Sequence, residues 1–242
     1  MKSKKGQNIK QHLSIFAYEK EKLNKLFLCI FLTTVSSQVS AFLFFGLVGK
    51  LDPEELFLKE FQTVFALAST ITMCILSVTG SIFIRKKVIR FYIGNQRSRI
   101  FLFPIKRSNL FIMKMAAFLV VVAAGIFLGM NSGLFLSVCL GFLLKLNTGT
   151  LFLQFFLGIV ICLAVVLLTV TVISFSSVIA IWRQSETAVL VASVLSIVIV
   201  SNLFAVGAIE IPGTLLIVYL IFSVGCLLFL LRFSKRIDEM DI

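Results

Sequence analysis

The chain has 242 residues, of which 59% are hydrophobic and three are proline, and its mean hydropathy is +1.07. This composition is typical of integral membrane proteins and excludes an ordinary soluble domain. The net charge of +12 does not indicate a nucleic-acid partner, because the basic residues follow the topology bias that membrane proteins show.

Six segments are long and apolar enough to cross a bilayer, which takes roughly 20 residues per helix. They are residues 26–48, 61–84, 115–144, 151–181, 187–207 and 212–231. Continuous apolar runs such as "FLVVVAAGIFLG" exclude a β-barrel, whose strands alternate apolar and polar residues. The sequence therefore predicts an all-α polytopic membrane protein with one six-helix domain at 26–231.

The distribution of Lys and Arg predicts the orientation of these spans. Twenty of the 23 basic residues fall on the side that holds both termini, and three, Lys50, Lys59 and Lys145, fall on the other. Because basic residues stay on the cytoplasmic side, we expect both termini inside and a multi-pass protein of the cell membrane. Basic residues near the surface also attract anionic membrane lipids.

Residues 1–25 precede the first span and repeat apolar residues near the helical period. Ile9, Leu13, Phe16 and Leu23 lie on that apolar side, with lysines on the remaining face. The pattern predicts a basic amphipathic helix on the inner membrane surface; the alternative is a solvated tail. Residues 232–242 form a charged cytoplasmic tail.

The predicted spans contain no residue typical of a proton relay, an intramembrane enzyme or a metal centre. Charged groups within a membrane are costly and usually functional, and here Glu60, Lys145, Glu186 and Glu210 lie at or near span ends. We expect no catalytic residue, no metal site and no cofactor on this chain. Active transport would need energy from another protein.

Small and polar residues mark where helices approach one another. Gly125, Gly129 and Gly133 repeat every fourth residue and predict a packing seam. The 30-residue third span must tilt, protrude or break, with a break expected at residues 131–133. The many serines and threonines are expected to serve helix-to-helix hydrogen bonds and close packing, and residues 203–216 are expected to form a tight external hairpin.

The cytoplasmic connection at 85–114 holds nine basic residues and no acid, yet it is rich in aromatic and aliphatic residues. We expect a short helix over about 95–103 and a turn fixed by Pro104, which cannot continue a helix. Ser108 is expected to be the N-cap of the third span. The apolar side of this short helix must be covered by lipid or by a partner.

The stretch "GNQRSRIFLFPIKRSNLFIMKM" resembles the first cytoplasmic loop of type-2 ABC transporter membrane subunits. The shared pattern is a glycine, a short helix, an aromatic or aliphatic run, Pro-Ile-x-Arg, and a lysine entering the third span. It matches Gly94, Leu102, Phe103, Pro104, Ile105, Arg107 and Lys114. The segment 95–97, Asn-Gln-Arg, departs from it, because many members place Thr and an acid there.

The resemblance implies a coupling helix between spans 2 and 3, seated in a cleft of a separate ATPase. The residues it assigns to that contact are Gly94, Gln96, Arg97, Arg99, Ile100, Phe101, Phe103, Pro104 and Arg107. It also implies two copies of the ATPase, which bind ATP and Mg, and a second copy of this chain or a similar permease.

Within that superfamily, the compact layout resembles small peptide or lantibiotic exporter permeases of Gram-positive bacteria. The uncharged, Phe-rich spans suit an amphipathic or hydrophobic cargo, which we expect to be a peptide. Two other functions remain open at this point. The chain could be a non-transporting membrane anchor or sensor partner of a cytoplasmic protein, or an intramembrane lipid-modifying enzyme.

Overall fold

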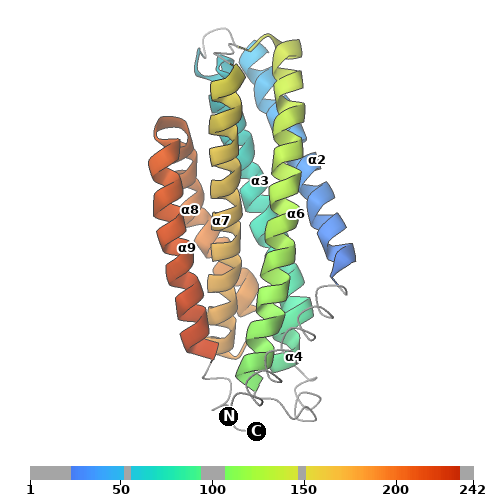
Figure 1. Cartoon of the computed structure of the whole chain (residues 1–242), viewed down its shortest axis with the longest axis vertical. Coiled ribbons are helices and arrows are strands. Elements are labelled where there is room, and N and C mark those ends of the chain that lie inside the picture. The colour runs from blue at the N-terminus through green and yellow to red at the C-terminus, as the bar shows by residue number, and fades with distance from the viewer. Residues whose placement is uncertain (1–22, 52–55, 94–106, 147–150, 235–242) are drawn as a thin grey trace, which may run out of the picture.

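Each apolar segment of the chain forms one long helix, and successive helices run in opposite directions (Figure 1). The computed structural model describes residues 23–51, 56–93, 107–146 and 151–234. In chain order the elements are α2 (Asn24–Leu51), the short 3-10 helix η1 (Leu56–Lys59), α3 (Phe61–Ile84), the π-helix η2 (Arg85–Ile89), α4 (Arg90–Ile93), α6 (Arg107–Leu144), α7 (Leu151–Arg183), α8 (Ala188–Glu210) and α9 (Pro212–Ser234).

Six of these helices, α2, α3, α6, α7, α8 and α9, are long and apolar enough to cross a membrane. No strand occurs in the ranges that the structure describes. The prediction of an all-helical chain with six potential spans is therefore confirmed. Continuous apolar helices satisfy their own backbone hydrogen bonds, which a membrane interior requires.

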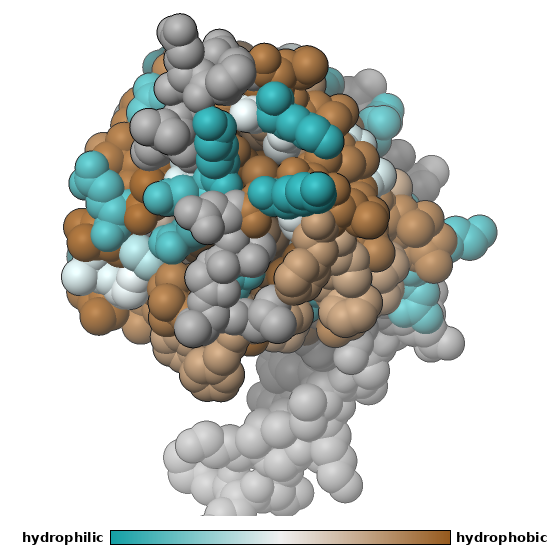
Figure 2. Space-filling view, turned by 90° about the horizontal axis from the view of Figure 1, so that it is seen from above, coloured by the Kyte–Doolittle hydropathy of each residue, from teal (hydrophilic) through white to brown (hydrophobic). Residues whose placement is uncertain are grey.

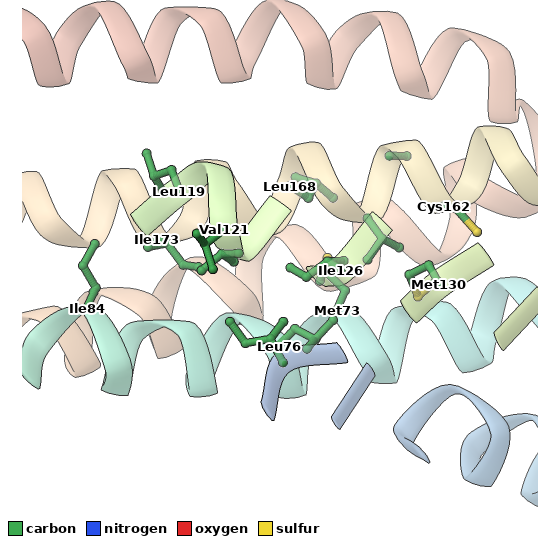
Figure 3. Packing of buried hydrophobic residues seen from close by; sticks show 14 of the residues in the cluster. Met73, Leu76, Ile84, Leu119, Val121, Ile126, Met130, Cys162, Leu168 and Ile173 are labelled. Carbon is green, nitrogen blue, oxygen red and sulfur yellow. The ribbon is translucent and has the colours of Figure 1, made fainter. Parts of the chain in front are cut away.

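The core lies where α3, α6 and α7 meet. Half or more of the most apolar part of each of these helices is buried, against less than a quarter for α8 and α9. Figure 3 shows Met73 and Leu76 of α3, Ile126 and Met130 of α6, and Leu168 of α7 in this cluster. The outer helices α8 and α9 pack on α7, and α8 also packs on α3.

The flank of the bundle is apolar and exposed. Large side chains such as Phe44, Phe135 and Phe152 are more than half exposed, and Figure 2 shows hydrophobic residues around the sides with hydrophilic ones gathered on the end face. In water such a flank would drive aggregation. In a bilayer it is matched by the lipid tails, so this arrangement fits a multi-pass membrane protein.

Helix α6 runs unbroken through residues 131–133, so the expected break there is wrong. Asn131 Nδ2 donates to the Phe127 carbonyl at 2.7 Å, and Ser132 Oγ donates to the Leu128 carbonyl at 2.9 Å. Both polar groups are thus satisfied within the helix. With 38 residues, α6 is about 57 Å long and extends beyond the hydrocarbon core.

The start of α6 also differs from the expectation. The helix begins at Arg107, so Ser108 is its second residue and not its N-cap. Basic residues lower the hydropathy of 107–114 without interrupting the helical backbone. The apolar segment therefore predicted the membrane-embedded part of α6, whereas the helix itself begins eight residues earlier.

Helices α8 and α9 form a tight hairpin in which Ile211 is the only non-helical residue. Pro212 is the first residue of α9, where the N–H that proline lacks has no helical partner in any case. The Ile211 N–H donates to the Gly207 carbonyl at 3.0 Å and completes the last turn of α8. In Figure 1 this turn lies short of the upper ends of α6 and α7.

Candidate functional site

The end of α3 widens into a π-helix, which precedes the segment that was predicted to contact an ATPase. The Arg90 N–H bonds to the carbonyl of Arg85, five residues earlier, which is the π pattern. Lys86 and Lys87 lie exposed on this turn, and Val88 and Ile89 lie buried. Single π turns occur often at functional sites. Here the turn sets the direction in which α4 leaves the bundle, at its lower end in Figure 1.

The two helix ends that border residues 94–106 pack against each other. The Tyr92 ring of α4 meets the Phe111 ring of α6 edge-on, with centroids 5.1 Å apart, and Phe111 is fully buried. One turn further along α6, Lys114 Nζ lies 4.7 Å from the centroid of the Phe91 ring. Both contacts are of the geometry that stabilises aromatic and cation–π pairs. These contacts join the end of α4 to the start of α6.

An ion pair ties the same region to the α7–α8 connection. Arg85 Nε lies 3.8 Å from Glu186 Oε2, and both side chains are about one-third exposed or less. At this distance and exposure the pair contributes less than about 1 kcal/mol. Its importance is geometric, because it links the π-helix to the turn between the inner helix α7 and the peripheral helix α8.

A cavity of about 320 Å³ opens beside these contacts. The described residues that line it come from the start of α2, from η2 and α4, and from the first turns of α6: Leu23, Lys86, Lys87, Val88, Phe91, Lys114 and Phe118. Three of them are lysines and none is acidic. The cavity therefore combines an apolar wall with a cationic one.

The three glycines of the predicted packing seam lie at the contact between α2 and α6. A Cβ atom on Gly129 would stand 2.7 Å from Thr34 Cβ, one on Gly133 would stand 3.0 Å from Gln38 Cγ, and one on Gly125 would stand 3.2 Å from Ile30 Cγ2. Glycine at these positions lets the backbones approach closely.

The seam is longer than the sequence interpretation allowed. Ser137 and Gly141 continue the four-residue spacing along α6, and a Cβ on Gly141 would lie 3.0 Å from the Phe61 ring of α3 and 4.0 Å from Phe42 Cζ of α2. On α2, a Cβ on Gly46 would lie 2.7 Å from Leu144. The four-residue spacing continues to position 141 in the sequence, but a search for glycine alone ends at 133 because position 137 is a serine.

Gln38 is the most conspicuous polar group of the bundle interior. It is fully buried on α2, and its Nε2 donates to Ser69 Oγ of α3 at 3.2 Å. Its Oε1 has no hydrogen-bond partner among the described residues. Gln38 therefore joins α3 to the α2–α6 seam, and sequence reasoning missed it because it looked for ionisable residues.

The expectation that serines and threonines bond between helices is wrong for most of them. Nine hydroxyls donate to carbonyls three or four residues earlier in their own helix: Thr33, Thr34, Ser36, Ser37, Thr70, Thr72, Ser174, Ser176 and Ser177. Short side chains reach the preceding turn more readily than a neighbouring helix. Ser69 is the exception, through Gln38.

Most residues predicted to contact an ATPase lie outside the described ranges. These are Gly94, Gln96, Arg97, Arg99, Ile100, Phe101, Phe103 and Pro104. The structure places Arg107 at the first position of α6. Of the predicted amphipathic helix, Ile9, Leu13 and Phe16 also lie outside, as does the tail 235–242, whereas Leu23 is buried beside the cavity.

Within the described part of the chain, no group of three His, Cys, Asp or Glu residues is placed to hold a metal ion. The described residues at this end combine cationic and apolar side chains around the cavity. Compared with family models, with curated proteins and with solved structures, the chain matches none.

Proposed function

We propose that this chain is the membrane subunit of an ATP-driven ABC exporter of the type-2 class. It forms, as a dimer with a second copy or a similar permease, the pathway for an amphipathic or hydrophobic cargo such as an apolar peptide. ATP hydrolysis takes place on two copies of a separate cytoplasmic subunit, and this chain is not itself an enzyme. Both termini and the α4 end face the cytoplasm.

The observation that carries the proposal is the packing between the two helix ends that border residues 94–106. The sequence of this segment has the coupling-loop pattern, and the segment connects two helix ends that are held together by Tyr92, Phe111, Phe91 and Lys114. Because α4 continues α3 through η2, a displacement of these two packed helix ends would reach both α3 and α6. These two helices belong to the core of the bundle, so their displacement would alter its packing.

The position of the charged residues supports an external energy source. In the described ranges, charged side chains lie at or near helix ends, with Lys114 two turns inside α6 the furthest from an end. Carriers driven by ion gradients usually hold a charged group deeper in the membrane. We therefore propose that the energy for transport comes from ATP hydrolysis by a partner protein.

The test is co-purification of this chain with the ABC-type ATPases of the same organism. Phe103→Asp and Arg107→Glu should each weaken capture of the ATPase at least tenfold, because they place an acid in a cationic, apolar contact. Lys145→Glu, a charge reversal at the opposite end of the bundle, should have no effect. All three variants should still insert into the membrane.

Retention of full ATPase binding and turnover in liposomes by both variants would contradict the proposal. Capture of the ATPase without any change in its hydrolysis rate, with candidate peptides present, would instead identify a membrane anchor. Stimulation by an apolar peptide would identify the cargo class.

A further inference from the structure

The cavity at the α4 end has the chemistry of a phospholipid headgroup site. Lys86, Lys87 and Lys114 supply positive charge, and Phe91 and Phe118 supply apolar surface. The single described acid near this end of the bundle, Glu186, is paired with Arg85 and does not line the cavity.

We propose that this cavity binds the phosphate headgroup of an anionic phospholipid, with the first methylenes of the acyl chains against the aromatic side chains. Basic pockets between membrane helices, open at the polar end of the spans, suit such headgroups. The assignment does not depend on the proposed export function. It requires only that the six apolar helices cross a membrane.

The position of Lys114 along α6 favours a lipid over a soluble anion. Lys114 lies seven residues into α6, about 10 Å along the helix axis from its start, while Lys86 and Lys87 follow the last turn of α3. Cationic groups at the ends of apolar helices lie at the level of the lipid headgroups, and their aliphatic stems cover apolar surface. A phosphate that enters from the membrane brings its own apolar part to Phe91 and Phe118.

The size of the cavity is consistent with partial enclosure of one lipid. Its volume of about 320 Å³ lies near the lower end of the range for ligand pockets, about 300–1,000 Å³. A headgroup and the start of its chains fit this space, and the remaining chain would lie along the exposed apolar flank.

The test compares retention of dioleoyl phosphatidylglycerol and dioleoyl phosphatidylcholine by the purified full chain, counted by native mass spectrometry. The unmodified protein should retain phosphatidylglycerol preferentially. The double variant Lys86→Gln/Lys87→Gln removes two exposed charges and should bind it about 25-fold more weakly, at about fivefold per lysine. Adding Lys114→Gln should abolish the preference.

The matched control is Arg90→Gln/Arg183→Gln, which removes two exposed charges at the same end without altering a residue of the cavity lining. It should retain the preference for phosphatidylglycerol, which excludes a general charge effect. A third arm adds inorganic phosphate, which should not displace the lipid.

Three results would overturn the assignment. Equal retention of the two lipids by the unmodified protein would show that the cavity takes no anionic headgroup. An equal loss in the control and in the lysine variant would show attraction by the whole surface. Displacement by millimolar phosphate would assign the cavity to a soluble anion. Because Lys86 and Lys87 are exposed, the melting temperature of the double variant should stay within a few degrees of the unmodified protein and exclude unfolding as the cause.

Discussion

At the scale of single residues, the α2–α6 contact depends on glycines of α6, which have no Cβ atom and therefore let the two helices approach closely. Gly129 faces both Thr34 Cβ and the Phe31 carbonyl oxygen, which a Cβ atom would approach to 3.1 Å. Neither neighbour is the end of a flexible side chain, so neither can turn aside. Any substituent must push the two helix axes apart.

Gly129→Ala should therefore destabilise the folded bundle by about 1–3 kcal/mol, the usual cost of overpacking. Gly225→Ala is the matched control, because Gly225 lies within α9 and a Cβ atom added to it would meet no atom within 4 Å. There the change should be neutral or slightly stabilising, since alanine favours helix over glycine. Thermal unfolding of both variants in detergent measures the difference. Equal melting temperatures would show that the seam tolerates separation.

The sequence predicted these glycines but not their partner helix. A four-residue spacing of small residues shows that something approaches α6 closely, and it carries no information about which helix that is. The partner is fixed by residues on α2 that recur with the same spacing, Ile30, Thr34 and Gln38. Their different chemical types hide this regularity until the two helices are seen together.

At the scale of elements, the π-helix and α4 show that the apolar segment and the helical backbone end at different residues. The apolar span was predicted to end at residue 84, and α3 does end at Ile84. The helical backbone nevertheless continues to Ile93 through η2 and α4. Lys86 and Lys87 stop the apolar run because they are unsuited to lipid, but lysine is a good helix former.

Few side chains of the peripheral hairpin α8–α9 are buried, although both helices pack on α7. Phe204 of α8 is fully buried and stacks with Tyr219 of α9, their ring centroids 6.1 Å apart, whereas the adjacent Leu203 is 65% exposed. Continuous hydrophobicity along α8 makes these two positions indistinguishable in the sequence. Only the packing assigns one to the protein interior and the other to lipid.

Phe204→Ala should accordingly destabilise the bundle by about 3 kcal/mol, because it leaves a cavity between α8, α9 and the core. Leu203→Ala is the control, and its cost should be below about 0.5 kcal/mol, since an exposed side chain loses few protein contacts. Equilibrium unfolding in mixed micelles compares the two. Similar losses at both positions would mean that α8 does not pack through its Phe204 face.

At the scale of the whole molecule, the number of spans followed from the lengths of the apolar segments, because a bilayer imposes a minimum length on every crossing. Which helices pack against each other could not be predicted in this way. Apolar helices in a membrane gain nothing from hiding hydrophobic surface from lipid, so their neighbours are chosen by close packing and a few polar contacts. The Gln38–Ser69 hydrogen bond and the glycine seam are such determinants, and both depend on geometry across chain segments.

The two ends of the bundle differ in charge, and this difference predicts its orientation. Among the described residues, the α4 end carries nine basic side chains (Lys25, Arg85, Lys86, Lys87, Arg90, Arg107, Lys114, Arg183 and Arg232), and the opposite end carries Lys50, Lys59 and Lys145. The rule that basic loops remain inside then predicts that the α4 end faces the cytoplasm. The consequence can be measured by accessibility from outside the cell.

The five native cysteines are free and can be replaced by alanine to give a background for labelling. In that background, Lys50→Cys should react with a membrane-impermeant maleimide in intact cells, whereas Arg90→Cys should react only after the membrane is permeabilised. Both positions are exposed, so the side of the membrane decides the result. Glu210→Cys, which removes a charge of opposite sign, controls for an effect of charge on insertion and should react like Lys50→Cys. Labelling of Arg90→Cys in intact cells would show the opposite orientation. The α4 end would then lie outside the cell and could not meet an ATPase in the cytoplasm.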